Sequence, residues 1–118
     1  MTDINKAIVF AKECLKWENA QYEHCSSGLE VFNGTADYGF YLTVEDVQRV
    51  LEEFLGRRFF IQINRGTSSL FKWSVIVGLQ NRVAGPKGMF DHGHGEGEDM
   101  LDAIFDACVA AVRLYPNA

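Results

Sequence analysis

The glycine-rich segment from Asp91 to Asp99 has the clearest capacity for chemistry. It holds two imidazoles and four carboxylates within nine residues, and proteins bind divalent metals with such groups. The spacing matches no established metal motif, so a site here needs a further ligand from elsewhere in the fold. The metal ligands that we expect are Asp91, His92, His94 and Glu96. The alternative is a solvated acidic loop whose histidines bind nothing.

The same segment places Gly93, Gly95 and Gly97 just ahead of a predicted helix, an arrangement typical of loops that hold a phosphate. It contains no Gly-Lys-Ser/Thr sequence and lacks the glycine spacing of dinucleotide-binding loops. Its carboxylates would also repel a phosphate at the place where it should bind. The sequence therefore disfavours a nucleotide site.

No other segment has a catalytic pattern. His24 and Cys25 are adjacent, and a neighbouring base can generate a reactive thiolate. Chain neighbours rarely have the required geometry, however, and no third orienting residue is identifiable, so we interpret the pair as part of a loop. Cys14 and Cys108 lie on or near apolar helix stripes and are predicted to be core residues. We therefore favour a protein without catalytic residues and without a cofactor.

Met89 and Phe90 form the apolar pair that we predict to be exposed, because both lie in a loop rich in glycine. Such a pair is a candidate anchor on a partner protein. Several other aromatic residues could build a binding surface, but a short domain uses most of them in its core. They are Trp17, Tyr22, Phe40, Tyr41 and Trp73.

The composition is that of one globular domain over residues 1–118. A formal net charge of −5 with scattered Lys and Arg disfavours direct binding of nucleic acid. No segment has the pattern of a signal peptide or the roughly 20 apolar residues of a membrane span. Three widely spaced cysteines argue against a disulfide framework, and we expect a cytoplasmic protein.

The first half of the chain predicts a helix over 4–17, from apolar residues at Ile4, Ile8, Ala11 and Leu15. Residues 24–28 are predicted to form a loop. Strands over 29–32 and 38–42 are predicted to pair as a ragged hairpin around Asn33-Gly34. Thr43 then caps a second helix, which Gly56 ends.

The second half predicts an antiparallel hairpin over 58–65 and 71–79, because apolar residues alternate in both segments. A loop is expected over 80–97 and a last helix over 100–114. The order is α-(ββ)-α-β-β-α, which does not alternate strictly. It predicts the α+β class, with a small antiparallel sheet of three to four strands packed with three helices.

The chain resembles the phage ABA sandwich domain family of small phage and prophage proteins. The resemblance covers most of the chain and includes the early helix with Trp17, the hairpin with a Trp, and the ending from Gly95 to Ala110. In that ending, small residues and a Cys follow a glycine-containing loop. The family has no established activity, so the resemblance implies no catalytic or binding residue.

The function that we predict is a non-enzymatic module that binds another protein. If the origin is viral, as the resemblance implies, the module would modulate or inhibit a host protein, for example in an anti-CRISPR role. One alternative is a metal-binding protein or metal-dependent enzyme built on the Asp91–Glu96 loop. Another is a homo-oligomer that pairs through sheet edges or exposed aromatic residues.

Overall fold

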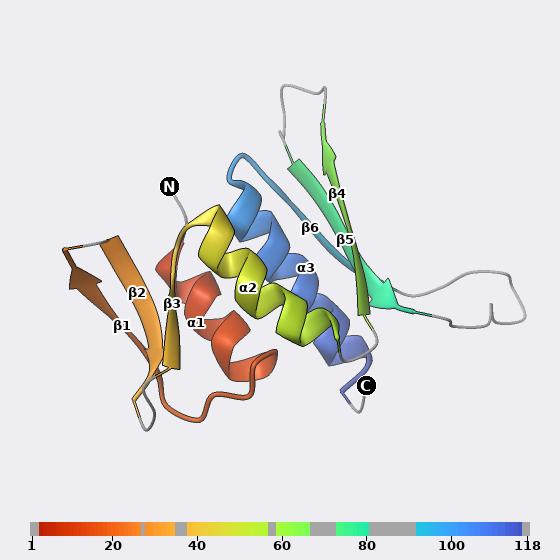
Figure 1. Ribbon diagram of the computed structural model, residues 1–118. Coiled ribbons are helices and arrows are strands. Elements are labelled where there is room, and N and C mark those ends of the chain that lie inside the picture. Colours follow the sequence, from red (N-terminus) through yellow and green to blue (C-terminus); the bar gives the residue numbers. More distant parts are fainter. Residues whose placement is uncertain are drawn as a thin grey trace, which may run out of the picture.

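The chain folds as three helices between two small antiparallel sheets. The computed structural model describes residues 3–26, 28–34, 38–56, 59–66, 73–80 and 92–116. The elements in chain order are α1 (Ile4–Glu13), β1 (Ala20–Cys25), β2 (Gly28–Asn33), β3 (Tyr38–Tyr41), α2 (Val44–Leu55), β4 (Phe59–Arg65), β5 (Trp73–Leu79), β6 (Gly93–Gly97) and α3 (Met100–Leu114). Figure 1 shows one sheet on each side of the helices. The predicted α+β class and the three helices are confirmed.

The strands form two sheets of three, in the orders β1-β2-β3 and β4-β5-β6, where we had predicted one sheet. The predicted hairpins are confirmed as β2-β3 and β4-β5. β1 and β6 were not predicted, because residues 24–25 and 93–97 had been assigned to loops and belong to these strands. In β6 the glycines alternate with His94 and Glu96. This is the period of a strand, and the glycines alone led us to predict a loop.

The helix boundaries follow from their caps. Thr43 accepts a hydrogen bond from the Asp46 amide at the start of α2, and Asp99 accepts from the amides of Leu101 and Asp102 at the start of α3. α1 ends at Glu13 and does not reach Trp17 as predicted. Lys16 adopts a φ of 61°, a left-handed conformation that cannot continue a right-handed helix.

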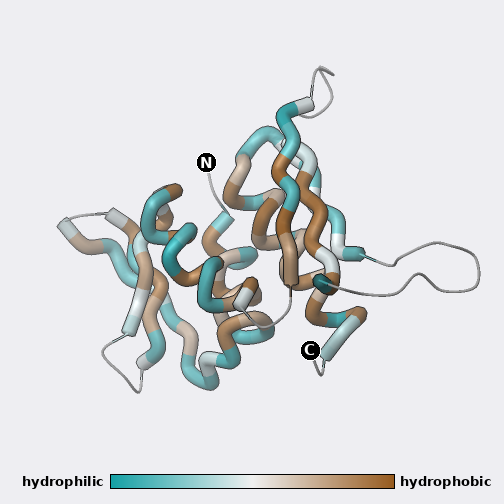
Figure 2. The backbone as a smooth tube through the Cα atoms, turned by 45° about the vertical axis from the view of Figure 1, so that its right-hand side comes forward, coloured by the Kyte–Doolittle hydropathy of each residue, from teal (hydrophilic) through white to brown (hydrophobic). Residues whose placement is uncertain are grey.

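Four phenylalanines from four elements form the centre of the core. Phe10 of α1 lies 6.3 Å from Phe40 of β3, 6.3 Å from Phe54 of α2 and 5.0 Å from Phe105 of α3, measured between ring centroids. All four rings are buried. The predicted stripe on α1 omitted Phe10 and is rotated from the observed buried face of Ala7, Phe10 and Ala11. In Figure 2 the hydrophobic segments of the strands and helices alternate with hydrophilic ones.

β6 packs so closely on α3 that the backbone of the strand contacts the backbone of the helix. A methyl group added at Gly93 would lie 2.5 Å from the amide nitrogen of Ala111, and one added at Gly95 would lie 2.9 Å from that of Ala107. The helix residues that face β6 are the small ones, Ala103, Ala107 and Ala111. The small residues on both elements therefore let strand and helix approach more closely than larger side chains would allow.

Among the residues that the structure describes, no helix combines the length and apolar character needed to cross a membrane.

The close approach of β6 to α3 predicts a large difference between two neighbouring glycines. We expect Gly95→Ala to lower the free energy of unfolding by roughly 3 kcal/mol, because the methyl group meets helix backbone that cannot move aside. Gly97→Ala should change it by less than about 1 kcal/mol, since its methyl group would come no closer than 4.0 Å to Asp99 nitrogen. Urea denaturation followed by tryptophan fluorescence measures both. Equal effects of the two substitutions would contradict this packing.

Candidate functional site

His94 lies on the outer face of the β4-β5-β6 sheet, beside a serine and a carboxylate. Ser74 Oγ is 3.0 Å from His94 Nε2, and Glu96 Oε1 is 3.3 Å from the same nitrogen. In a hydrolytic triad the hydroxyl faces one ring nitrogen and the carboxylate orients the other. Here both groups share Nε2, so the arrangement does not activate Ser74 as a nucleophile.

The predicted metal ligands are only partly described. Asp91 lies outside the described residues. His92 is exposed and lies next to Gly78 of β5, while His94 and Glu96 contact each other from the same face of β6. Within the described ranges, these three residues do not bring their ligand atoms within 4.8 Å of one another. The metal site thus stays a prediction, as does the anchor pair Met89 and Phe90, which also lies outside the described residues.

One trio of potential ligands does converge, on the outer face of the β1-β2-β3 sheet. Atoms of Glu23, Cys25 and Glu30 lie within 4.8 Å of one another, and Glu23 is paired directly with Glu30 across the two strands. Like charges in that position destabilise a sheet. Cys25 Sγ is 3.7 Å from Glu23 Oε1. A thiolate and two carboxylates are groups that zinc accepts. Sequence reasoning missed the trio because it treated His24-Cys25 as loop, although Cys25 and Glu30 are only five residues apart.

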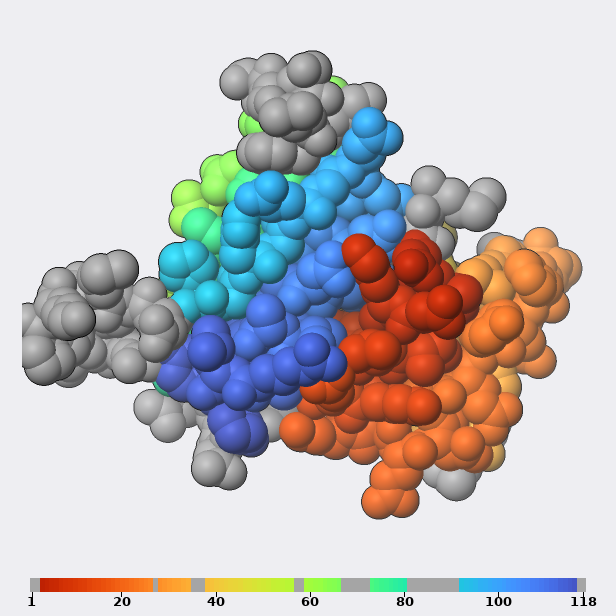
Figure 3. Space-filling model, turned by 180° about the vertical axis from the view of Figure 1, so that it is seen from behind, coloured from red at the N-terminus to blue at the C-terminus, as the bar shows by residue number. Residues whose placement is uncertain are grey.

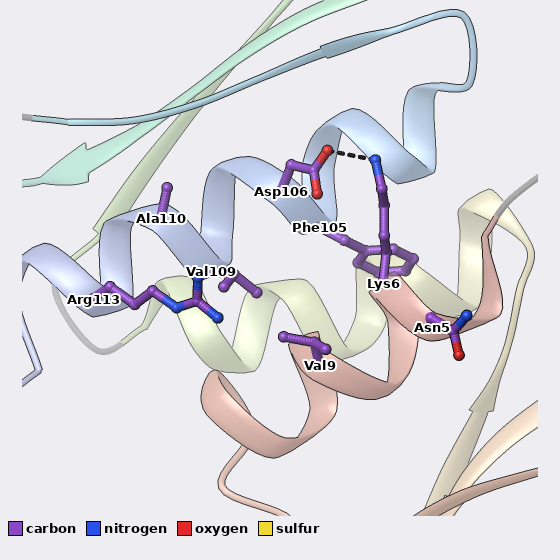
Figure 4. A pocket seen from close by; sticks show the side chains of 8 residues that line it. All are labelled: Asn5, Lys6, Val9, Phe105, Asp106, Val109, Ala110 and Arg113. Atoms are coloured by element: carbon purple, nitrogen blue, oxygen red, sulfur yellow. Dashed lines mark hydrogen bonds and ion pairs between the residues drawn. The ribbon is translucent and has the colours of Figure 1, made fainter.

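A shallow pocket between α1 and α3 lies on the side of the molecule seen in Figure 3. Its volume is about 280 Å³, and apolar side chains such as Val9, Phe105 and Val109 line it. Figure 4 shows the cations Lys6 and Arg113 at its ends.

Both cations of this pocket are already engaged. Lys6 Nζ lies 2.7 Å from Asp106 Oδ2, and Arg113 binds Glu13 through two hydrogen bonds of 2.9 and 2.7 Å. These bonds raise the pKa of Lys6 and lower the pKa of Glu13. An anionic ligand would have to displace a carboxylate, so the ion pairs serve to join α1 to α3.

A fourth candidate is a groove bounded by α2, β4 and the start of α3. It encloses about 400 Å³, and nine of its eleven lining residues are apolar. Two of these, Val44 of α2 and Ile63 of β4, are 49% and 41% exposed. The full lining consists of Val44, Val47, Gln48, Leu51, Glu52, Leu55, Ile61, Ile63, Met100, Leu101 and Ile104.

Sequence reasoning did not identify this groove, although α2 carries a signal for it. Val47, Val50, Leu51, Phe54 and Leu55 form one apolar face of this helix in the sequence. Phe54 and Val50 do face the core, but Leu51 and Leu55 line the groove together with Val44. An apolar stripe wider than one neighbouring element can cover indicates a second contact surface.

Searches for similar proteins give no relative from which a function could be transferred, because no family model, curated protein or solved structure matches the chain. The resemblance to the phage ABA sandwich domain therefore stays a prediction. In the structure, the three helices form a layer between the two sheets.

The trio on the first sheet predicts a slowly reacting Cys25. Partial desolvation raises the pKa of its thiol, and the carboxylates of Glu23 and Glu30 raise it further. Less thiolate is then present near neutral pH, so alkylation is slow. We expect the double substitution Glu23→Gln and Glu30→Gln to lower this pKa and speed alkylation by iodoacetamide several-fold, as measured by mass spectrometry of the Cys25 peptide.

Glu18→Gln is the matched control, because it removes an acidic charge that lies just before β1 and outside the trio. The carboxylates would not control the thiol if this control variant and the double variant reacted at the same rate. Cys14 and Cys108 are buried, so their peptides report unfolding if it occurs.

Proposed function

We propose that this chain is a non-enzymatic interaction module that binds an apolar segment of another protein in the groove between α2, β4 and α3. The observation that carries the proposal is the half-exposed pair Val44 and Ile63 above an apolar lining. Large apolar side chains that remain exposed around a concave surface favour burial against a partner.

The free energy gained by burying these exposed side chains limits the kind of partner that can bind. Complete burial of a Val or Ile side chain contributes about 1.5–3 kcal/mol, so covering a half-exposed one contributes roughly half of this amount. Association costs at least about 4 kcal/mol in lost translational and rotational freedom. Two residues alone are insufficient. A partner must also cover Leu55, Ile61 and Met100, which are half-buried at the groove, and it must therefore present several apolar side chains in a row.

A narrower role as a phage-encoded modulator or inhibitor of a host protein, such as a CRISPR effector, agrees with a module of this kind. Its support is the resemblance to small phage proteins, and it requires the partner to be a host protein.

The interaction is tested by placing a photo-crosslinking amino acid at position 63 or, as a control, at position 60. Ile63 and Phe60 are 41% and 40% exposed on the same strand, but they lie on opposite faces of it. We expect a covalent adduct of one defined mass in host cells from position 63 and none from position 60. The adduct is then identified by mass spectrometry.

The identified partner, once purified, should bind the unmodified chain and the Phe60→Asp variant alike. Ile63→Asp should weaken binding by at least about tenfold, since it places a charge over the apolar lining. Equal crosslinking from both positions would contradict the proposal, and so would an adduct with a second copy of the chain.

The alternative function is metal binding on the segment from Asp91 to Glu96, and the observation in its favour is the contact between His94 and Glu96 on one face of β6. This alternative predicts heat of binding with zinc or nickel in titration calorimetry, and its loss in the His92→Ala, His94→Ala double variant. Metal binding that persists in the double variant would place the metal site elsewhere in the protein. If neither protein binds metal, the alternative function is excluded.

A further inference from the structure

The groove has the length and the walls of a helix-binding site. Its α2 wall uses Val44, Val47, Gln48, Leu51, Glu52 and Leu55, which are spaced three or four residues apart and span about 16 Å, or three helical turns. Two of the three walls are helices, and their backbone groups are already bonded within the helix. These two helices therefore offer only side chains to a ligand. The third wall, β4, is the edge strand of its sheet, and it contributes the side chains of Ile61 and Ile63 to the lining. A ligand that satisfies its own backbone and presents one apolar stripe therefore fits best.

Most of the charged side chains beside the groove are acidic. Glu45 and Glu52 are exposed on α2, and neither forms an ion pair with another residue that the structure describes. Other charged residues of α2 are engaged on the side away from the groove. Arg49 binds the Gly39 carbonyl and Asp46, and Glu53 accepts a hydrogen bond from Tyr38.

A third carboxylate lies at the open end of the groove. α2 and α3 both begin at this end (Figure 1), and Glu98 is exposed just before Met100, which lines the groove. The rim therefore presents the carboxylates of Glu45, Glu52 and Glu98. They outnumber the cation Arg65, which is exposed two residues beyond Ile63 on the same face of β4, with its guanidinium 5.8 Å from the Trp73 ring. A ligand with Lys or Arg beside its apolar stripe would complement this rim, whereas a second copy of this acidic chain would be repelled.

From these observations we infer that the groove binds an amphipathic helix of about three turns that carries basic residues along the border of its apolar stripe. This inference rests on the proposed function and specifies the chemistry of the partner. The apolar lining supplies affinity, and the acidic rim selects for basic partners and against acidic ones.

The test uses two synthetic helical peptides of about 14 residues, each held helical by a covalent staple and labelled with a fluorophore. Both carry leucine at the same stripe positions, and the border positions hold three lysines in one peptide and three glutamates in the other. We expect the lysine peptide to bind at least about tenfold more tightly at low salt, measured by fluorescence anisotropy, and to lose part of this advantage as salt screens the rim.

Substitutions in the protein distinguish the contribution of the apolar lining to binding from that of the acidic rim. Ile63→Asp should abolish binding of the lysine peptide, while Phe60→Asp, which adds the same charge on the other face of β4, should leave it unchanged. The double substitution Glu45→Lys and Glu52→Lys should reverse the preference between the two peptides. A lysine peptide that binds the Ile63→Asp and Phe60→Asp variants equally would show attraction to an acidic surface only and would overturn the inference.

The outcome also separates this inference from the proposed function. If both peptides bind equally and Ile63→Asp abolishes both, the groove remains a protein-binding site, but the preference for a basic helix is wrong. If neither peptide binds while the crosslink at position 63 still identifies a partner, the groove takes a segment of another shape and the inference falls alone. Loss of the crosslink as well would remove the proposed function.

Discussion

The backbone contact between β6 and α3 is the constraint on which the rest of the structure depends. Gly93 and Gly95 leave no room for a side chain above Ala107 and Ala111, so the strand and the helix are locked in one register. Since β5 and β4 pair onward from β6, this contact also fixes the position of the whole second sheet. α3 is in turn joined to α1 by the ion pairs Lys6–Asp106 and Glu13–Arg113. Both pairs join residues 100 positions apart, so the two helices run in parallel.

The groove follows from this arrangement. α3 packs closely under β6 and β5 and leaves the inner face of β4 to be covered by α2. The ring of Phe54 stacks on Phe59 at 4.7 Å, which joins α2 to the start of β4, but Ile63 near the other end of the strand stays 41% exposed. A helix that touches a strand at one end and diverges from it at the other leaves an apolar wedge. Among the residues that the structure describes, no further element fills it.

Local chemistry made much of the fold predictable. Thr43 and Gly56 marked the ends of α2, the alternation in 58–65 and 71–79 marked a hairpin, and the last helix was placed correctly over 100–114. The division into two sheets could not be predicted, since it depends on which strands a helix separates in space. β6 was missed because glycine usually weakens a strand. Here it is required by a helix whose close approach only the folded structure reveals.

The candidate site was harder to predict for a related reason. Chemical reasoning is drawn to histidines and cysteines, and it directed attention to the segment from Asp91 to Asp99. The groove consists of leucines, isoleucines and valines that are indistinguishable in sequence from core residues. They differ only in their neighbours. Leu55 is half-buried and lines the groove, whereas Phe54, its neighbour in α2, is 1% exposed and lies in the core. Only the arrangement of α2 against β4 separates the two roles.

The charge distribution connects the groove to the rest of the molecule. Residues 17–48 contain six acidic residues and no Lys or Arg, a formal charge of −6, while the rest of the chain, with eleven basic and ten acidic residues, carries +1. The acidic stretch comprises the first sheet and the start of α2, and therefore includes the open end of the groove. Its field extends over about 10 Å at moderate ionic strength. It would draw a basic segment toward this side of the molecule before any apolar contact forms, so long-range attraction and short-range burial would act at the same end of the groove.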